Sequence, residues 1–277
     1  MTDKALPPGK SHGRKSIRPT LVPRDLMAEA SATDVWTARI ITLVPQAFPG
    51  ILGESLTGRA LKDGLWQLET IDLRLFGDGR HRNVDDTPAG GGAGMVLRPD
   101  VMGRAIDRAM DGTEGGTATG KQGDWPLIYL SPRGKRFDQA MAHRLRAARG
   151  VTMICGRFEG LDERVIEHYG IEEVSLGDFI LTGGELAAQM MIDATVRLLP
   201  GVLGNSESTV NESFSDGLLE HPQYTRPAEW KGRSIPDVLM SGHHGEIEKW
   251  RRQQSEELTR ARRPDLWSRR GTGPEQD

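Results

Sequence analysis

The 277-residue sequence contains a single cysteine, Cys155. One thiol cannot form an internal disulfide or a zinc site built from several thiolates. No segment approaches the ~20 consecutive apolar residues that a membrane-spanning helix needs, and the N-terminus has no apolar signal-peptide core. These absences predict a cytoplasmic, soluble protein, and the length allows one large domain or a medium and a small one.

Common nucleotide and metal motifs are also missing. No predicted strand is followed by G-x-G-x-x-G. The stretch Gly115–Lys121 matches the beginning of a phosphate-binding loop, but Gln122 stands where Ser or Thr is required, and no strand precedes it. The pair His243-His244 lacks a cysteine or a close carboxylate pair, so a surface position is the better interpretation than a metal site.

The formal net charge of −3 says little about partners, but its distribution is uneven. Basic residues predominate in segments 1–24, 121–149 and 226–270, whereas segment 150–225 is acidic. This pattern fits a face that attracts polyanions, although charge alone favours ordinary solvated surface. Three tryptophans lie among Arg and Lys and could stack on bases or pack between helices. They are Trp230, Trp250 and Trp267.

Hydrophobic periodicity predicts alternating strands and helices. Apolar runs typical of strands occupy residues 38–44, 66–76, 126–130, 151–155 and 172–176. Helical patterns occupy residues 45–61, 102–110, 135–149, 185–199, 235–239 and 247–263. This alternation predicts an α/β fold with a mostly parallel sheet covered by helices. A glycine-rich loop is expected at residues 77–94.

Four regions follow from this reading. Residues 1–35, with prolines and basic residues, are predicted to be a disordered extension. Residues 36–202 form the α/β domain, residues 203–216 a polar linker, and residues 217–277 a small helical C-terminal domain.

Three glycine-containing turns directly follow predicted strands: Ser131–Gly134, Gly156–Gly160 and Gly177–Gly184. In open α/β sheets, ligands bind outside the carboxyl ends of the strands, and glycine there lets the backbone approach a ligand. Each turn alone is best read as an ordinary strand–helix connection. Together they predict one crevice lined by backbone groups.

Four motifs occur in an order that resembles one enzyme family. They are Tyr129-Leu-Ser-Pro-Arg-Gly134, Cys155-Gly-Arg-Phe-Glu-Gly-Leu-Asp-Glu-Arg164, Leu176-Gly-Asp-Phe-Ile-Leu-Thr-Gly-Gly-Glu185 and Gly217-Leu-Leu-Glu-His-Pro-Gln-Tyr-Thr-Arg-Pro227. The chain is similar from Ala38 to Leu266 to the bacterial tRNA (guanine-N1)-methyltransferases, which act on the guanosine just 3′ of the anticodon.

The resemblance implies a trefoil-knotted domain of the SPOUT class that binds S-adenosylmethionine, without a metal, largely through backbone groups. It assigns one wall of the site to Tyr129, Leu130, Ser131, Pro132 and Gly134. A second wall comprises Gly156, Phe158, Glu159 and Gly160. The third comprises Leu176, Gly177, Asp178, Phe179, Ile180, Leu181, Gly183 and Gly184. It also implies an obligate homodimer with shared active sites and tRNA binding by the C-terminal domain.

The chemistry calls for a base, because guanine N1 is a poor nucleophile until its proton leaves. By resemblance the base is the residue before Ser213-Phe214, where the family has Asp and this chain has Glu212; Asp216 is the alternative. Arg197 matches an arginine that stabilises charge on guanine O6, although a cation at a helix C-terminus is also explained by the helix dipole. We expect Arg197 and Glu212 to enter one site from opposite subunits.

Other departures from the family are milder. Phe158 stands where Tyr is common, and Ala89 and Ala93 replace Tyr and Pro in the loop 86–95, which we expect near cofactor and tRNA. Two rival functions remain. One is a knotted methyltransferase acting on ribose or another RNA, which would not need a linker carboxylate. The other is a non-catalytic RNA-binding protein, which would not need intact glycine turns.

Overall fold

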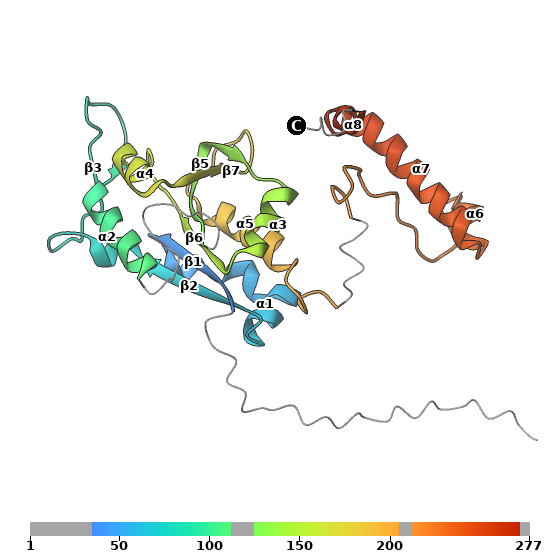
Figure 1. Cartoon of the computed structure of the whole chain (residues 1–277), viewed down its shortest axis with the longest axis horizontal. Helices are drawn as coiled ribbons and strands as arrows, with labels where there is room; N and C mark the ends of the chain where they lie inside the picture. Colours follow the sequence, from blue (N-terminus) through green and yellow to red (C-terminus); the bar gives the residue numbers. More distant parts are fainter. Residues whose placement is uncertain (1–34, 112–124, 205–211, 272–277) are drawn as a thin grey trace, which may run out of the picture. The chain divides into compact units, whose positions relative to one another are not determined.

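The computed structural model describes residues 35–111, 125–204 and 212–271 (Figure 1). Its centre is a five-stranded sheet in the order β2-β1-β6-β5-β7, and every pairing in it is parallel. This confirms the prediction of an α/β fold with a parallel sheet. The strands are β1 (Trp36–Thr42), β2 (Trp66–Asp72), β5 (Leu127–Arg136), β6 (Gly150–Ile154) and β7 (Glu172–Ser175).

Helices cover both faces of the sheet. Successive residues of a strand point to opposite faces, and β1 has apolar residues on both. Ile40 belongs to a core cluster with α1 (Ser55–Lys62), α3 (Gln139–Ala147) and α5 (Glu185–Val196). Ile41 belongs to a second cluster with α2 (Pro99–Met110) and α4 (Glu163–Tyr169). Figure 1 shows these two groups of helices on opposite sides of the strands. β1 is accordingly buried almost throughout, as expected of a strand covered on both faces.

Several predicted boundaries are wrong. The helix expected over residues 45–61 begins only at Ser55, after two short 3-10 helices. The strand expected over residues 126–130 continues to Arg136. The second strand ends at Asp72, whose carboxylate accepts a hydrogen bond from the backbone N–H of Arg74 and begins the short helix η3 (Leu73–Phe76). The helix expected from residue 135 begins at Gln139, because Lys135 and Arg136 still pair with β7. The carboxylate of Asp138 accepts from the N–H of Met141 at 2.9 Å and caps that helix.

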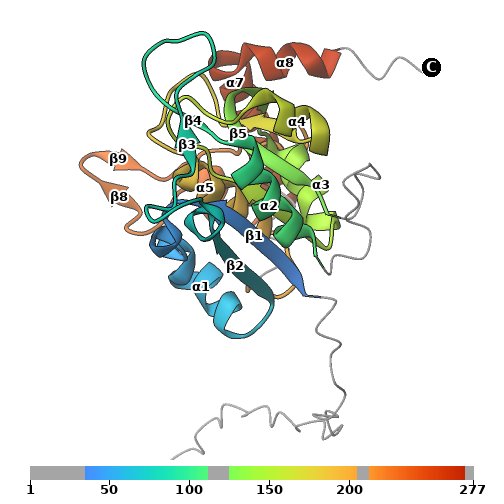
Figure 2. The same cartoon turned by 90° about the vertical axis from the view of Figure 1, so that its left-hand side faces the viewer.

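Several short elements were not expected from the sequence. They are η1 (Pro45–Ala47), η2 (Gly50–Gly53), β3 (Asp85–Asp86), β4 (Val96–Leu97), β8 (Glu229–Trp230), β9 (Arg233–Ser234) and α8 (Pro264–Gly271). Helix α4 was not expected either. The loop that joins β3 to β4 extends away from the sheet in both views (Figure 2). Near the C-terminus, α6 (Asp237–Met240) and α7 (His244–Arg262) lie close to the predicted helical segments. Across the described ranges, no helix is long and apolar enough to cross a membrane.

Candidate active site

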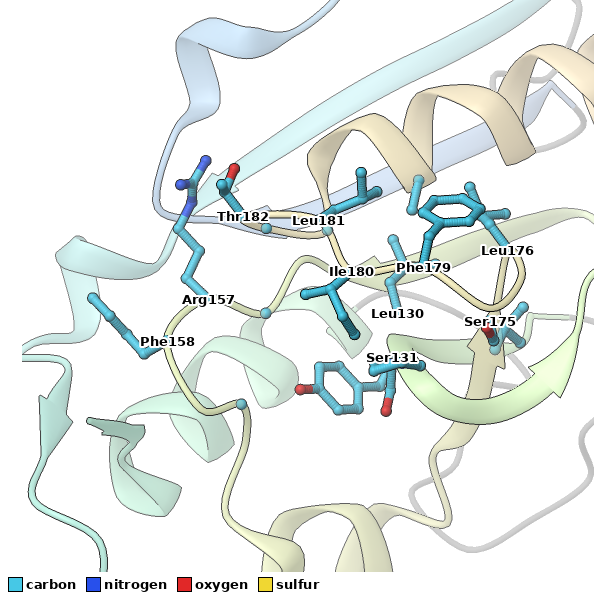
Figure 3. A pocket seen from close by; sticks show the side chains of 18 of the residues that line it. Leu130, Ser131, Arg157, Phe158, Ser175, Leu176, Phe179, Ile180, Leu181 and Thr182 are labelled. Carbon is cyan, nitrogen blue, oxygen red and sulfur yellow. The ribbon is translucent and has the colours of Figure 1, made fainter. Parts of the chain in front are cut away.

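The three glycine turns meet around one pocket with a cavity of about 260 Å³; the first lies within β5, and the other two follow the carboxyl ends of β6 and β7. Figure 3 shows Ile180 extending toward Leu130 and Ser131, while Phe158 and Arg157 lie on a separate loop. Ile180 is 80% exposed, an unusual state for an isoleucine beside a cavity. An exposed apolar side chain over a pocket is typical of a ligand-binding wall.

A four-residue bulge in β5 builds the first wall. Leu130 and Lys135 both lie opposite Val174 of β7, so residues 131–134 leave the ladder between them. Ser131 and Pro132 in this bulge line the pocket. Gly134 does not. A Cβ atom on Gly134 would lie 2.3 Å from backbone atoms of Glu173 and Val174, so this glycine permits the close return of β5 onto β7.

The second wall is the loop after β6, which main-chain hydrogen bonds fix on both sides. The N–H of Leu97 donates to the carbonyl of Gly160, and the N–H of Glu159 donates to the carbonyl of Met95, each at 2.9 Å. The N–H of Gly184 donates to the carbonyl of Gly156 at 3.0 Å. Segment 156–160 is therefore held between the β3–β4 loop and the start of α5.

The buried carboxylate of Glu185 connects the second wall to the end of β1. It accepts hydrogen bonds from the hydroxyl of Thr42 at 2.8 Å and from Nη2 of Arg157 at 3.0 Å. These partners come from the end of β1 and from the second wall, so one carboxylate at the start of α5 ties three segments together.

Burial, with the nearby Glu185 charge, raises the pKa of the Cys155 thiol well above its ordinary value, so this cysteine stays protonated.

The third wall, after β7, is shaped by Ser175. Its hydroxyl accepts from the N–H of Gly177 and donates to the carbonyl of the same residue, both at 3.1 Å. Gly177 has φ +145°, a conformation that side-chain-bearing residues rarely adopt. The following residues, 179–184, then line the pocket up to the first turn of α5.

The pocket contains most of the residues assigned to it from the sequence. Two of the predicted set lie outside it: Gly134, for the reason above, and Asp178, which is exposed. Sequence reasoning missed some lining residues, namely Arg157, Val174, Ser175, Thr182 and Ala187. Arg157 and Thr182 lie inside the quoted motifs, and their positions between assigned residues were the available signal.

The two predicted catalytic residues lie together. Nη1 of Arg197, at the end of α5, donates to Oε2 of Glu212 at 2.7 Å, and Nη2 contacts the other carboxylate oxygen. The hydrogen bond from Arg197 holds the pKa of Glu212 below its usual value. Both contacting side chains belong to one chain, and the entry of Arg197 and Glu212 into one site from opposite subunits stays a prediction. Neither residue lines the pocket described above.

The remaining candidate residues have varied surroundings. The Gly115–Lys121 stretch lies outside the described residues, as does nearly all of the predicted N-terminal extension. Trp250 packs near the ring of Tyr224, and the Arg260 guanidinium lies over Trp267, which favours the helix-packing interpretation for both. Trp230 is 61% exposed. Within the described ranges, no group of three His, Cys, Asp or Glu side chains is placed to hold a metal ion.

Comparison with known proteins gives one consistent family. The family profile described as "tRNA (Guanine-1)-methyltransferase TrmD" matches residues 37–269. A protein of Ruegeria pomeroyi named tRNA (guanine-N(1)-)-methyltransferase is 73% identical over 85% of this chain and 93% of its own length. Proteins of the same name from Roseobacter denitrificans and Brucella ovis are 63% and 56% identical, over 89% and 83% of this chain and 99% and 90% of their own lengths. The chain belongs to the tRNA (guanine-1)-methyltransferase family, a SPOUT-class family of transferases.

Proposed function

We propose that the protein transfers a methyl group from S-adenosylmethionine to N1 of the guanosine at tRNA position 37, next to the anticodon. The substrate and the methylated atom follow from the names of the family and of its relatives. The position beside the anticodon follows from the resemblance of the four motifs. The observation that carries the proposal is the meeting of three glycine turns around one pocket, together with a carboxylate–arginine pair suited to guanine.

The pocket residues fit this methyl donor. Its walls combine apolar side chains, such as Leu130 and Ile180, with main-chain groups of three loops. An adenine ring needs both, because its faces are apolar while its edge carries hydrogen-bonding groups. S-adenosylmethionine, when bound, supplies a methyl group that its sulfonium already activates. The three loops would hold and orient the donor, and the knot implied by the family would shape them.

The Arg197–Glu212 pair supplies the chemistry on guanine. Glu212 removes the proton from N1, which frees the nitrogen lone pair to accept the methyl group. Negative charge then develops on O6, and the Arg197 guanidinium stabilises it there. The two roles require Arg197 to leave the carboxylate when guanine enters. Once released, the carboxylate loses the contact that lowers its pKa and becomes a stronger base.

This release predicts a specific pH dependence. The profile of kcat/KM reports the free enzyme, in which Arg197 lowers the pKa of Glu212, whereas the profile of kcat reports the complex. We therefore expect the acidic limb of kcat to lie at higher pH than that of kcat/KM. In Arg197→Ala the acidic limb of kcat/KM should move upward and meet that of kcat. Coinciding limbs in the wild type would contradict the release step.

We further propose that the protein acts as a homodimer in the cytoplasm, where tRNA is found. Leu186 and Met190 lie one turn apart on α5 and are 61% and 59% exposed, while the rest of that helix is largely buried. Large apolar side chains exposed side by side on an otherwise buried helix are typical of a protein–protein contact. A second copy would cover this face and bring its own Arg197–Glu212 pair to the pocket, which the pair of the same chain does not line.

Charging this face should therefore separate the subunits. We expect Leu186→Asp/Met190→Asp to be folded but monomeric by sedimentation and to lose methyl transfer. Leu75→Asp, at a residue 64% exposed but outside α5, should stay dimeric. Sharing of sites is tested by mixing chains carrying Glu212→Gln with chains carrying Gly156→Val. Recovered activity supports one site built by two chains; no recovery after confirmed subunit exchange contradicts it.

The proposed function itself is tested on an unmodified tRNA transcript. Purified protein is incubated with it and isotope-labelled S-adenosylmethionine, and the product nucleosides are mapped by mass spectrometry. We expect 1-methylguanosine at position 37 alone. A ribose 2′-O-methyl product would favour the rival knotted enzyme. Donor binding without any methylated nucleoside would favour a non-catalytic RNA-binding protein.

A further inference from the structure

A positively charged turn lies outside the pocket. Residues 79–82, which we term the basic turn, have the sequence Gly-Arg-His-Arg, and all four are exposed. The side chains of Arg80, His81 and Arg82 make no hydrogen bond or ion pair within the part of the chain that the structure describes. Many other arginines hold a carboxylate; examples are Arg98, Arg104, Arg133, Arg144 and Arg164.

The base of the basic turn is firmly built. Asp78 and Asn83 exchange two backbone hydrogen bonds, at 3.2 and 2.9 Å. Both carboxylate oxygens of Asp78 are occupied, one by Arg98 at 2.7 Å and the other by Arg104 at 3.0 Å. Arg104 also donates to the carbonyl of Phe76 at 2.6 Å. The only acidic residue between positions 78 and 83, Asp78, is therefore already paired with arginines at the base. The cationic side chains of the basic turn are held by a base that these contacts fix.

Backbone hydrogen bonds connect the base of the basic turn to the candidate active site. The carbonyl of Val84, two residues beyond the basic turn, accepts from the N–H of Arg98 at 2.9 Å. The preceding residue, Leu97, donates to the carbonyl of Gly160 in the pocket wall. At about 3.5 Å per residue, this path places the basic turn within about 20 Å of that wall. A nucleic acid with one base at the pocket would therefore extend to the turn.

We propose that the basic turn binds the sugar–phosphate backbone of the tRNA, away from the methylated base. Guanidinium groups recognise phosphate through two parallel hydrogen bonds. An arginine without a carboxylate partner breaks no ion pair when it binds phosphate. A turn held in shape by its base also loses little conformational entropy on binding. This inference rests on the proposed function, because it takes tRNA as the substrate. It adds a contact that orients the RNA without touching the reacting atoms.

The test is the double variant Arg80→Ala/Arg82→Ala. We expect tRNA affinity to fall about tenfold and the slope of log affinity against log salt concentration to decrease by about 1.5, since two phosphate contacts are lost. KM for tRNA should rise, while kcat at saturating tRNA and affinity for S-adenosylmethionine stay unchanged. Arg80→Lys/Arg82→Lys should retain most of the salt dependence, because it keeps both charges.

The matched control is Arg108→Ala/Arg146→Ala, which removes two exposed cations from α2 and α3. An equal loss of affinity in this control would overturn the inference, because the effect would then come from net charge. An unchanged salt slope in the basic-turn variant, or its conversion to a monomer, would overturn it as well. In each case 1-methylguanosine formation by the wild type would leave the proposed function standing.

Discussion

Replacement of Glu212 by glutamine is expected to lower the turnover number by about 100-fold or more, the usual scale for loss of a general base. Glutamine keeps the shape of the side chain and can still contact Arg197, but it cannot accept the proton of guanine N1. Affinity for S-adenosylmethionine should change little, because Glu212 does not line the pocket. Single-turnover methylation with saturating tRNA measures the effect on the chemical step.

Two neighbouring substitutions make this test specific. Glu212→Asp should retain most activity, because it restores the carboxylate of the family at a position one methylene shorter. Asp216→Asn should be nearly neutral, since Asp216 is exposed and faces Arg252 at 3.4 Å. If Glu212→Gln turned over at the wild-type rate while Asp216→Asn were inactive, the base would be Asp216.

The second large effect is expected from Gly156→Val, which should abolish binding of S-adenosylmethionine. A Cβ atom at Gly156 would lie 2.7 Å from the ring of Tyr129, which is buried and lines the same pocket. Valine adds two methyl groups beyond that atom. Gly156 and Tyr129 both line the pocket, so the added side chain and the displaced ring reduce the space for the ligand. Calorimetric titration with S-adenosylmethionine measures the loss.

A fold control separates a filled pocket from a damaged protein. Gly245, at the first turn of α7, has nothing within 4 Å of its Cβ position, so Gly245→Val should bind the donor normally. Gly156→Val should retain the far-ultraviolet circular dichroism of the wild type. Normal donor binding by folded Gly156→Val would mean that the methyl donor occupies another site.

The sequence predicted the sheet and the position of the pocket because both depend on local patterns. Buried strands such as β1 and β6 are short apolar runs, and the glycine turns follow strands directly. The course of β5 could not be predicted in this way. Ser131–Gly134 is typical of a turn, and only the return of Lys135 to the same partner, Val174, makes it a bulge. That pairing depends on a residue about forty positions away.

Other differences have the same origin. The apolar spacing of Phe137, Met141 and Leu145 suggested a helix from residue 135, although Asp138 before the helix is a recognisable capping residue. α4 is only seven residues long and buries few apolar side chains, so its periodicity is weak. The position of Arg157 depends on Glu185, which lies in another motif. Pairings between distant segments, rather than local propensity, decide these features.

The strand order also constrains how the chain assembles during synthesis. β1 lies between β2 and β6, and Thr37 pairs with Gly150, so an early strand waits for a partner roughly 110 residues later. At ribosomal rates of about 5–20 residues per second, that wait is about 5–20 s. Until then one edge of β1 stays open, and none of the three pocket walls can form. Nascent chains stalled before β6 should therefore be sensitive to protease and retained by chaperones, whereas those extended past α5 should be protected.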